Sequence, residues 1–231
     1  MIFATILAGG SGSRMGSTEK PKQFLLLGEK PVLIHTIEKF VLNDKFDDII
    51  LLTPKEWINH TKDLINKYLP NESIKVIESG NLRIDTVKNA MDYINENYPD
   101  DDNIIVTHDA VRPFVSHRII EENIEAAKNH DACNTIIPAT DTIVRSKDSE
   151  FVDEIPNRDE LYQGQTPQSF KLTKLQELYD KLDDNQKENL TDACKIFTIN
   201  NEPVAIVKGD ISNIKITYPF DLKVANFILK E

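Results

Sequence analysis

The sequence predicts an α/β fold: a mostly parallel sheet with helices on both faces. Short continuous apolar runs, typical of buried parallel strands, alternate along the chain with stretches whose apolar residues recur at helical spacing. Such alternation indicates βαβ units, and right-handed crossovers place the connecting helices on both faces of the sheet. A chain of 231 residues suffices for this architecture, and we expect residues 1–231 to form a single domain.

The individual elements follow from the apolar pattern in chain order. The expected strands are Ile2–Leu7, Asp48–Leu52, Ile74–Ile77, Ile104–Thr107 and Cys133–Ile137. The expected helices are Pro31–Leu42, residues 55–68, Leu82–Tyr93, residues 117–129 and a last helix with Phe220, Val224 and Ile228 on its apolar face. Proline suits the first position of the first helix, and Ser116 can cap the fourth.

One stretch, Asp141–Glu160, interrupts the alternation. Its apolar runs Thr142–Val144 and Phe151–Ile155 are separated by the polar residues 145–150. This pattern predicts a projecting β-hairpin arm over about residues 140–160. A plain surface hairpin and an arm that contacts a partner fit the pattern equally well. Beyond it, the polar run Gln163–Gln168 predicts a turn within an apolar context.

The composition excludes several classes of function. The chain has 27 Lys and Arg against 38 Asp and Glu, a net charge of -11, which argues against a nucleic-acid polymer or an anionic membrane as partner. The opening MIFATILAGG is too short for a membrane helix and lacks a signal-peptide pattern. Cys133 and Cys194 make no disulfide framework, and the histidines form no zinc motif. We therefore expect a cytoplasmic protein.

The first predicted strand leads directly into a glycine-rich loop, Leu7–Gly16. Small residues let backbone N–H groups approach a polyphosphate closely. The loop is not a Walker A motif, because no Gly-Lys-Ser/Thr closes it. Residues 9–22 carry three cations, Arg14, Lys20 and Lys22, against the single acid Glu19. This local positive charge predicts a phosphate site in which Arg14 and Lys22 contact phosphate oxygens, with a surface salt bridge as the alternative for Arg14.

A second candidate site residue, Asp109, follows the fourth predicted strand. Ligands of a parallel sheet bind at the carboxyl ends of its strands. One carboxylate there, with phosphate oxygens and water, suits Mg²⁺, so Asp109 is a predicted Mg²⁺ ligand; a turn or capping aspartate is the alternative. Arg112 is expected to bind a second substrate or to hold Asp109, and we expect His108 to be structural.

Two further polar segments are candidate binding loops. The amides of Gly80–Thr86, together with the Thr86 hydroxyl, are suited to reading a base or a sugar. In Gly209–Thr217, Lys215 lies between two isoleucines, and alternation points its side chain away from theirs, either into solvent or into a cleft. Each segment taken alone is more typical of an ordinary loop than of a binding site.

Taken in order, five motifs give a specific resemblance. They are LAGGSGSRMG at residues 7–16, PKQF at 21–24, HDAVRPF at 108–114, QTPQSF at 165–170 and NIKIT at 213–217. Over nearly the whole chain, the sequence resembles the cytidylyltransferase family that holds the 2-C-methyl-D-erythritol 4-phosphate enzyme and the ribitol-5-phosphate enzyme. The resemblance implies a Rossmann-like, GT-A-like nucleotidyltransferase fold.

Within that family, two stretches look closest to the ribitol-5-phosphate branch, which makes CDP-ribitol for teichoic-acid or capsule polymers. These stretches are Tyr162–Gln168 and Leu190–Ile196. In addition, Asn81 and Thr86 stand where the methylerythritol enzymes usually carry an acidic residue and a serine. The methylerythritol enzyme of isoprenoid synthesis is the alternative. A non-catalytic nucleotide-binding regulator is the alternative of another class, since fold alone does not establish activity.

The resemblance implies a reaction in which the acceptor phosphate attacks the α-phosphorus of CTP and pyrophosphate leaves, with Mg²⁺ as cofactor. The residues implied for catalysis are Arg14, Lys22 and Lys215. Those implied for CTP binding are Leu7, Ala8, Gly9, Gly10, Gly12, Ser13, Gly80, Arg83, Thr86, Asp109 and Ala110, with Asp109 also on the metal. Those implied for acceptor binding are Arg112, Asp141, Arg158 and Thr166.

The resemblance also implies partners. The small-molecule partners are CTP and a polyol phosphate. In this family the arm embraces a second subunit and helps to form that subunit's site, so we expect a homodimer through residues 140–160. Whether a ribulose-5-phosphate reductase that supplies the acceptor also binds the chain stays open. A dinucleotide-dependent dehydrogenase fits less well, because Leu52-Thr53-Pro54 offers no acidic residue after the second strand.

Overall fold

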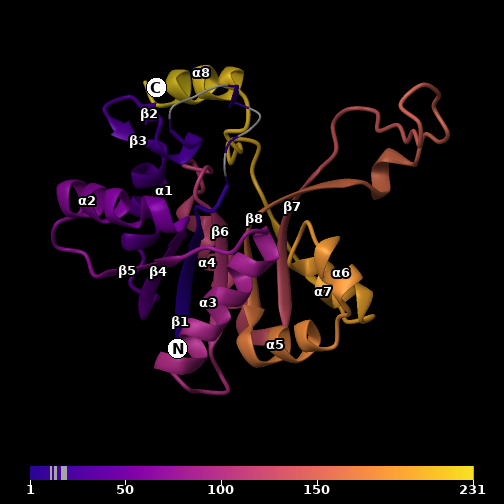
Figure 1. Cartoon of the computed structure of the whole chain (residues 1–231). Helices are drawn as coiled ribbons and strands as arrows, with labels where there is room; N and C mark the ends of the chain where they lie inside the picture. Colours follow the sequence, from indigo (N-terminus) through magenta and orange to yellow (C-terminus); the bar gives the residue numbers. More distant parts are fainter. Residues whose placement is uncertain (11, 13–14, 17–19, 231) are drawn as a thin grey trace.

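A computed structural model of the chain describes residues 1–10, 12, 15, 16 and 20–230. Its centre is a seven-stranded sheet in the order β5-β4-β1-β6-β8-β7-β9 (Figure 1). The strands are β1 (Ile2–Leu7), β4 (Asp48–Thr53), β5 (Ile74–Glu78), β6 (Ile104–Asp109), β7 (Ala132–Pro138), β8 (Tyr162–Lys171) and β9 (Ala205–Lys208). Only β8 runs antiparallel to its neighbours, so the predicted mostly parallel sheet is confirmed. A small second sheet pairs β2 (Leu26–Leu27) with β3 (Lys30–Pro31).

Helices cover both faces of the large sheet, as predicted. They are α1 (Val32–Val41), α2 (Ile58–Tyr68), α3 (Arg83–Asn97), α4 (His117–Asn129), α5 (Leu172–Asp180), α6 (Asp184–Glu188), α7 (Cys194–Ile199) and α8 (Pro219–Ile228). Short 3-10 helices among the described residues include η2 (Lys22–Phe24), η3 (Lys55–Trp57) and η4 (Arg158–Glu160). No helix in the described part of the chain is long and apolar enough to cross a lipid bilayer.

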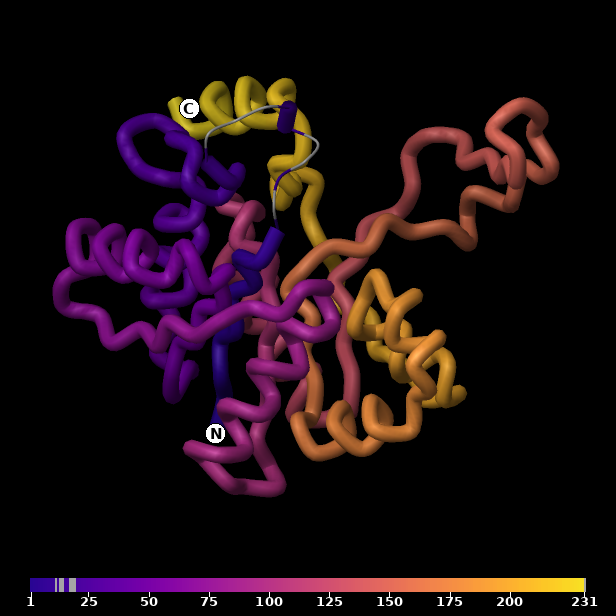
Figure 2. The backbone as a smooth tube through the Cα atoms, viewed as in Figure 1, coloured from indigo at the N-terminus to yellow at the C-terminus, as the bar shows by residue number. Residues whose placement is uncertain are grey.

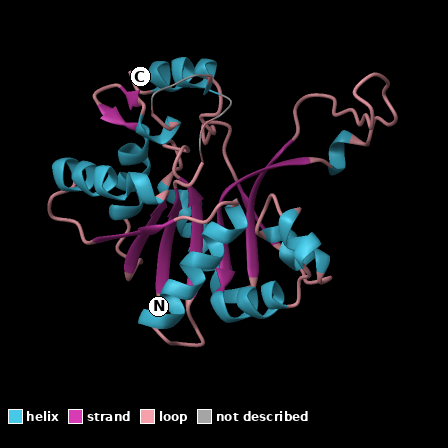
Figure 3. Ribbon diagram, viewed as in Figure 1, coloured by secondary structure: helices cyan, strands magenta, loops and turns pink. Residues whose placement is uncertain are grey.

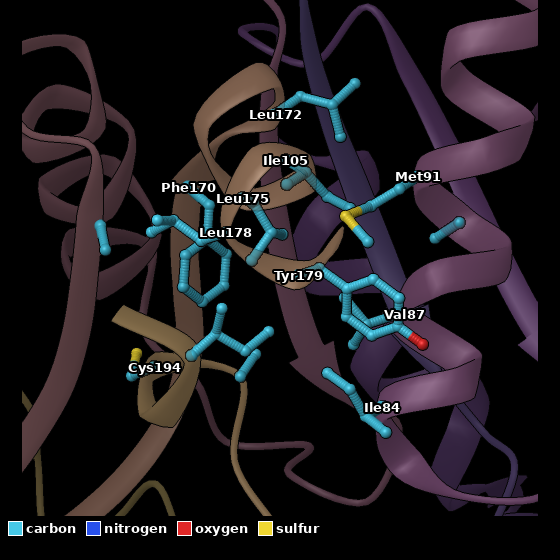
Figure 4. Packing of buried hydrophobic residues seen from close by; sticks show 14 of the residues in the cluster. Ile84, Val87, Met91, Ile105, Phe170, Leu172, Leu175, Leu178, Tyr179 and Cys194 are labelled. Atoms are coloured by element: carbon cyan, nitrogen blue, oxygen red, sulfur yellow. The ribbon is translucent and has the colours of Figure 1, made fainter. Parts of the chain in front are cut away.

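Two apolar clusters sandwich the sheet, because side chains alternate along each strand. Phe3 and Leu7 of β1 pack with α3, α5 and α7, whereas Ala4 and Ile6 pack with α1, α2 and α4. Figure 4 shows the first cluster, where Met91 of α3 lies beside residues of α5 such as Leu175. The two clusters fix the strands relative to one another, and thereby fix the edge at which their carboxyl ends meet.

The predicted turn at Gln163–Gln168 is wrong, because these residues form the first part of β8, at the centre of the sheet. The polarity of the second half does not mark a surface loop, since the side chains of Gln165, Thr166 and Gln168 are buried and hydrogen-bonded. Gln168 is fully buried and donates from Nε2 to Asn134 Oδ1 at 3.0 Å and Asp192 Oδ2 at 2.7 Å. A buried polar strand of this kind depends on tertiary partners such as these to satisfy most of its polar groups.

The predicted arm projects from the body of the molecule, but it lacks the two expected strands. Figure 2 shows residues around 140–160 reaching away from the sheet, and Figure 3 shows them mainly as loop. The strands predicted at Thr142–Val144 and Phe151–Ile155 are replaced by a single antiparallel bridge between Arg145 and Glu154, which also form a salt bridge at 2.8 Å. The apolar side chains of an isolated hairpin have nothing to pack against, which makes such a pair of strands marginal.

Candidate active site

A cavity of about 370 Å³ opens at the carboxyl ends of β1 and β6. Its walls come from the glycine-rich loop after β1, the start of η2, the loop before α3, the end of β6 and the segment after β9. The predicted site residues that line it are Leu7, Ala8, Gly9, Gly10, Gly12, Lys22, Gly80, Arg83, Thr86, Asp109, Ala110 and Lys215. The sequence thus predicted most of one continuous surface, because parallel strands bring their carboxyl ends to a common edge.

Close approach of backbone explains the glycines of the loop. Gly12 has a φ of +74°, and a Cβ there would lie 3.2 Å from the backbone nitrogen of Lys22. A Cβ on Gly9 would lie 3.0 Å from Ser79, in the segment that leads to α3. Larger residues would therefore push the loop away from both neighbouring walls of the cavity.

Lys22 is held against the cavity by the two residues that follow it. Gln23 is buried and donates from Nε2 to the Ala8 carbonyl at 2.7 Å, which ties η2 to the glycine-rich loop. Phe24 stacks on Trp57 with ring centroids 4.9 Å apart. Lys22 itself is 8% exposed and lines the cavity. Its ammonium group is thus carried by a fixed element rather than by a free loop.

The wall before α3 is a tightly folded segment. Gly80 N–H donates to Thr86 Oγ1 at 3.1 Å, and the Thr86 hydroxyl donates to the Leu82 carbonyl at 3.0 Å. Leu82 N–H donates to Asp85 Oδ2 at 3.0 Å. These local bonds start α3 and leave residues 80–82 along the cavity. A backbone carbonyl held in place along this wall can accept a hydrogen bond from the edge of a base.

Three cations meet on the carboxylate of Asp109. Its Oδ1 pairs with Arg83 Nη1, and its Oδ2 pairs with Lys215 Nζ at 2.9 Å and with Arg112 Nε at 3.3 Å. Burial alone would raise the pKa of Asp109, but the charges of Arg83, Lys215 and Arg112 outweigh it and hold that pKa well below its usual range. Asp109 is therefore ionised at neutral pH, and Lys215 faces the cleft rather than open solvent.

Behind Asp109, a buried polar network connects β6, β8 and the segment after β9. His108 Nδ1 lies 3.0 Å from Thr166 Oγ1, its Nε2 lies 3.2 Å from the Arg112 carbonyl, and Thr166 Oγ1 also accepts the Asp109 N–H at 3.1 Å. Arg112 Nη1 donates to the Asn213 carbonyl at 2.7 Å. Burial lowers the pKa of His108 to about 3, so the ring is neutral and links other residues, as expected of a structural histidine.

The buried His108 predicts a loss of folding stability in mild acid. The unfolded histidine takes up a proton below about pH 6.5, whereas the folded ring, with a pKa of about 3, does not. The neutral, buried ring therefore makes its full contribution to the free energy of unfolding above about pH 6.5. This contribution is lost between pH 6.5 and 3, and about 2 kcal/mol of it is lost by pH 5. Urea unfolding at pH 7 and pH 5 measures the change in the free energy of unfolding. Between these two pH values, His108→Gln should lose about 2 kcal/mol less of that free energy than the wild type does. A loss in His108→Gln equal to that of the exposed control His130→Gln would contradict the assignment.

The residues around Asp109 do not fit a resident Mg²⁺ ion. Both carboxylate oxygens already pair with cations, and a divalent ion beside them would meet three positive charges. No group of three or more His, Cys, Asp or Glu side chains in the described ranges is arranged to hold a metal. The assignment of Asp109 as a metal ligand therefore disagrees with this geometry, and a requirement for Mg²⁺ stays a prediction.

The four predicted acceptor-binding residues are not brought together. Arg112 and Thr166 lie behind Asp109 in the buried network, and they do not line the cavity. Asp141 and Arg158 lie on the arm, where Arg158 donates to the Thr140 carbonyl at 3.3 Å. Ser13 and Arg14 lie outside the described residues. Lining residues to which the sequence analysis assigned no binding role are Gln23, Asn81, Leu82 and Val111, although each stands within or beside a predicted motif.

Comparison with known proteins places this cavity in a family. Residues 2–231 match the profile of the 2-C-methyl-D-erythritol 4-phosphate cytidylyltransferase (IspD) family. The chain belongs to this family. The match spans all five motifs and every described wall of the cavity, so the predicted resemblance to these cytidylyltransferases is confirmed at the level of the family.

Solved structures of IspD proteins support the same assignment. The 4-diphosphocytidyl-2C-methyl-D-erythritol synthase of Anaerococcus prevotii is 30% identical, with a TM-score of 0.82, covering 100% of this chain and 96% of that one. The 2-C-methyl-D-erythritol 4-phosphate cytidylyltransferase of Francisella tularensis is 28% identical, with a TM-score of 0.81 and 98% of each chain covered. The enzyme of Thermus thermophilus, 23% identical with a TM-score of 0.74 over 100% of both chains, agrees in fold. These names identify the chemistry of the family, whereas the acceptor of this chain stays a prediction.

Proposed function

We propose that this chain transfers the cytidylyl group of CTP to D-ribitol 5-phosphate, giving CDP-ribitol and pyrophosphate. The observation that carries the transfer chemistry is the cavity itself. Backbone groups of a glycine-rich loop, a fixed lysine and an Arg–Asp–Lys cluster surround one space at the carboxyl edge of the sheet. Such a space suits a nucleoside triphosphate, since it offers amides and cations to phosphates and a folded backbone segment to a base.

The walls suggest one orientation of CTP. The base would lie against residues 80–86, where a backbone carbonyl can accept the exocyclic amine that distinguishes cytosine from uracil. The triphosphate would lie along the loop between Lys22 on one side and Lys215 with Arg83 on the other. Arg14, which the sequence places in the same loop, would add a further cation.

The reaction needs charge neutralisation more than proton transfer. The attacking group is a phosphate oxygen, which is already an anion at neutral pH. Its bond to the α-phosphorus forms as the bond from that phosphorus to the α,β-bridging oxygen of CTP breaks. That oxygen leaves as a terminal oxygen of pyrophosphate, and no general base is needed. Lys22 and Lys215 would stabilise negative charge on the equatorial oxygens and the leaving group, and the rigid walls would align the two phosphates.

The choice of acceptor rests on sequence rather than on the cavity. Tyr162–Gln168 and Leu190–Ile196 favour ribitol 5-phosphate, and the structure joins them through Gln168 and Asp192. The named relatives favour 2-C-methyl-D-erythritol 4-phosphate as the second candidate. The two acceptors share a phosphate and a short polyol, so discrimination depends on hydroxyl and methyl contacts.

Pyrophosphate release separates the candidates. The purified chain is incubated with CTP, Mg²⁺ and either acceptor, and we expect release with ribitol 5-phosphate well above release with 2-C-methyl-D-erythritol 4-phosphate. Release with 2-C-methyl-D-erythritol 4-phosphate alone would contradict ribitol 5-phosphate as the acceptor. It would not contradict the proposed nucleotide site. CTP binding without release against either acceptor would favour a non-catalytic nucleotide-binding regulator.

The arm supports a homodimer with shared sites. Five of its apolar side chains are exposed, a concentration that is typical of a contact surface: Ile143, Val144, Phe151, Val152 and Ile155. Arg158 and Asp141 would then complete the acceptor site of the other subunit, since neither lines the cavity of its own chain.

Polar substitutions in the arm test the dimer. We expect Phe151→Ser combined with Ile155→Ser to give a monomer by light scattering, with acceptor KM raised about tenfold or more. Lys147→Ala, at the exposed tip, is the control. A dimer with normal acceptor KM in the double variant would sink this proposal.

A further inference from the structure

The three cations on Asp109 are not held equally. Arg112 is 9% exposed, and its guanidinium also donates to a buried backbone carbonyl, that of Asn213. Arg83 and Lys215 are 24% and 38% exposed, and both line the cavity. Asp109 thus has a fixed partner behind it and two partners that face the space where phosphates would come.

We infer that Asp109 is a positioning residue, a carboxylate that holds Arg83 and Lys215 in place until substrate phosphates replace it, and not a metal ligand. The inference rests on the proposed function, since it names what the same cavity does before CTP arrives. Arg112 keeps Asp109 in place throughout. Arg83 and Lys215 exchange a carboxylate oxygen for a phosphate oxygen, which is a change of partner without a large movement.

Electrostatics explain why such a carboxylate is useful. Without Asp109, the positive charges of Arg83, Arg112 and Lys215 would repel one another within a partly buried space. With it, each cation is oriented before the substrate binds, so little reorganisation remains for the reaction step. The carboxylate also competes with phosphate for the cations. This competition lowers the affinity of the site for pyrophosphate and so allows pyrophosphate to leave.

Calorimetric binding of inorganic pyrophosphate in EDTA tests the inference without turnover. Asp109→Asn removes the competing charge, so we expect it to bind pyrophosphate about three- to tenfold more tightly than the wild type. The exposed control Asp63→Asn should bind as the wild type does.

In turnover assays, kcat of Asp109→Asn should fall about 10²-fold, because the cations are no longer oriented. The Mg²⁺ concentration for half-maximal activity should stay within about twofold of the wild-type value.

Opposite results would identify a metal ligand. Unchanged pyrophosphate affinity in EDTA, together with a Mg²⁺ midpoint raised about tenfold or more, would overturn the inference. If Asp109→Asn is unfolded in buffer alone, pyrophosphate should restore a thermal unfolding transition, because the anion supplies the missing charge; failure to restore it would also overturn the inference. If the wild type releases no pyrophosphate with either acceptor, the proposed function fails, whereas the binding comparison still decides the role of Asp109.

Discussion

Lys22→Ala is expected to lower kcat for pyrophosphate release by about 10²- to 10³-fold while leaving the fold intact. Lys22 lines the cavity at the point where η2 meets the glycine-rich loop, and Gln23 and Phe24 anchor the turn independently of the lysine side chain. We therefore expect the ammonium group to act chiefly by supplying charge to the transition state. Lys22→Arg should restore only part of the rate, since a guanidinium has a different reach and shape.

Steady-state kinetics with circular dichroism as a check of folding measure this effect. Lys39→Ala, an exposed position on α1 that does not line the cavity, is the charge-matched control and should keep normal turnover. Turnover of Lys22→Ala within about threefold of that control would contradict the assigned role.

Gly80→Ala is expected to raise KM for CTP by about tenfold or more and to lower the free energy of unfolding by about 2 kcal/mol. A Cβ at this position would lie 2.2 Å from Asp85 Cβ and 2.6 Å from the Asp85 backbone carbon. The segment must therefore shift its backbone, which breaks the Gly80–Thr86 and Leu82–Asp85 hydrogen bonds that shape the wall proposed to bind the base.

Gly164→Ala is the matched control, because a Cβ there meets nothing within 4 Å. It should leave KM for CTP and the free energy of unfolding within error of the wild type. A Gly80→Ala protein with unchanged KM for both CTP and UTP would show that residues 80–86 do not read the base.

The parts of the site that the sequence predicted are those fixed by local pattern. Asp109 and the glycine-rich loop each follow an apolar run, and parallel strands place such positions at one edge. The partners of Asp109 could not be predicted from the same rule. Arg83 and Lys215 come from segments 26 and 106 residues away, and only the packing of α3 and of the segment after β9 brings them to one carboxylate.

Polar strands and isolated arms were the least predictable parts of the fold. β8 carries Gln165, Thr166 and Gln168 on buried positions, and their hydrogen bonds come from β6, β7 and loops distant in sequence. A hydropathy pattern therefore indicates a turn where a central strand exists. In the arm the apolar pattern correctly predicted a projecting segment. It did not predict the absence of strands, because a strand needs packing neighbours, and a single chain supplies none at the exposed Phe151 and Ile155.

The fate of the α-phosphate of CTP tests the central claim most directly. CTP labelled at the α-phosphorus is incubated with Mg²⁺ and ribitol 5-phosphate, and the products are separated and counted. The account predicts that the label appears in a cytidine diphosphate polyol while unlabelled pyrophosphate is released in equal amount. Label recovered as free CMP, or as CDP with a phosphate passed to the acceptor, would show that the cavity performs hydrolysis or phosphoryl transfer and would contradict the account.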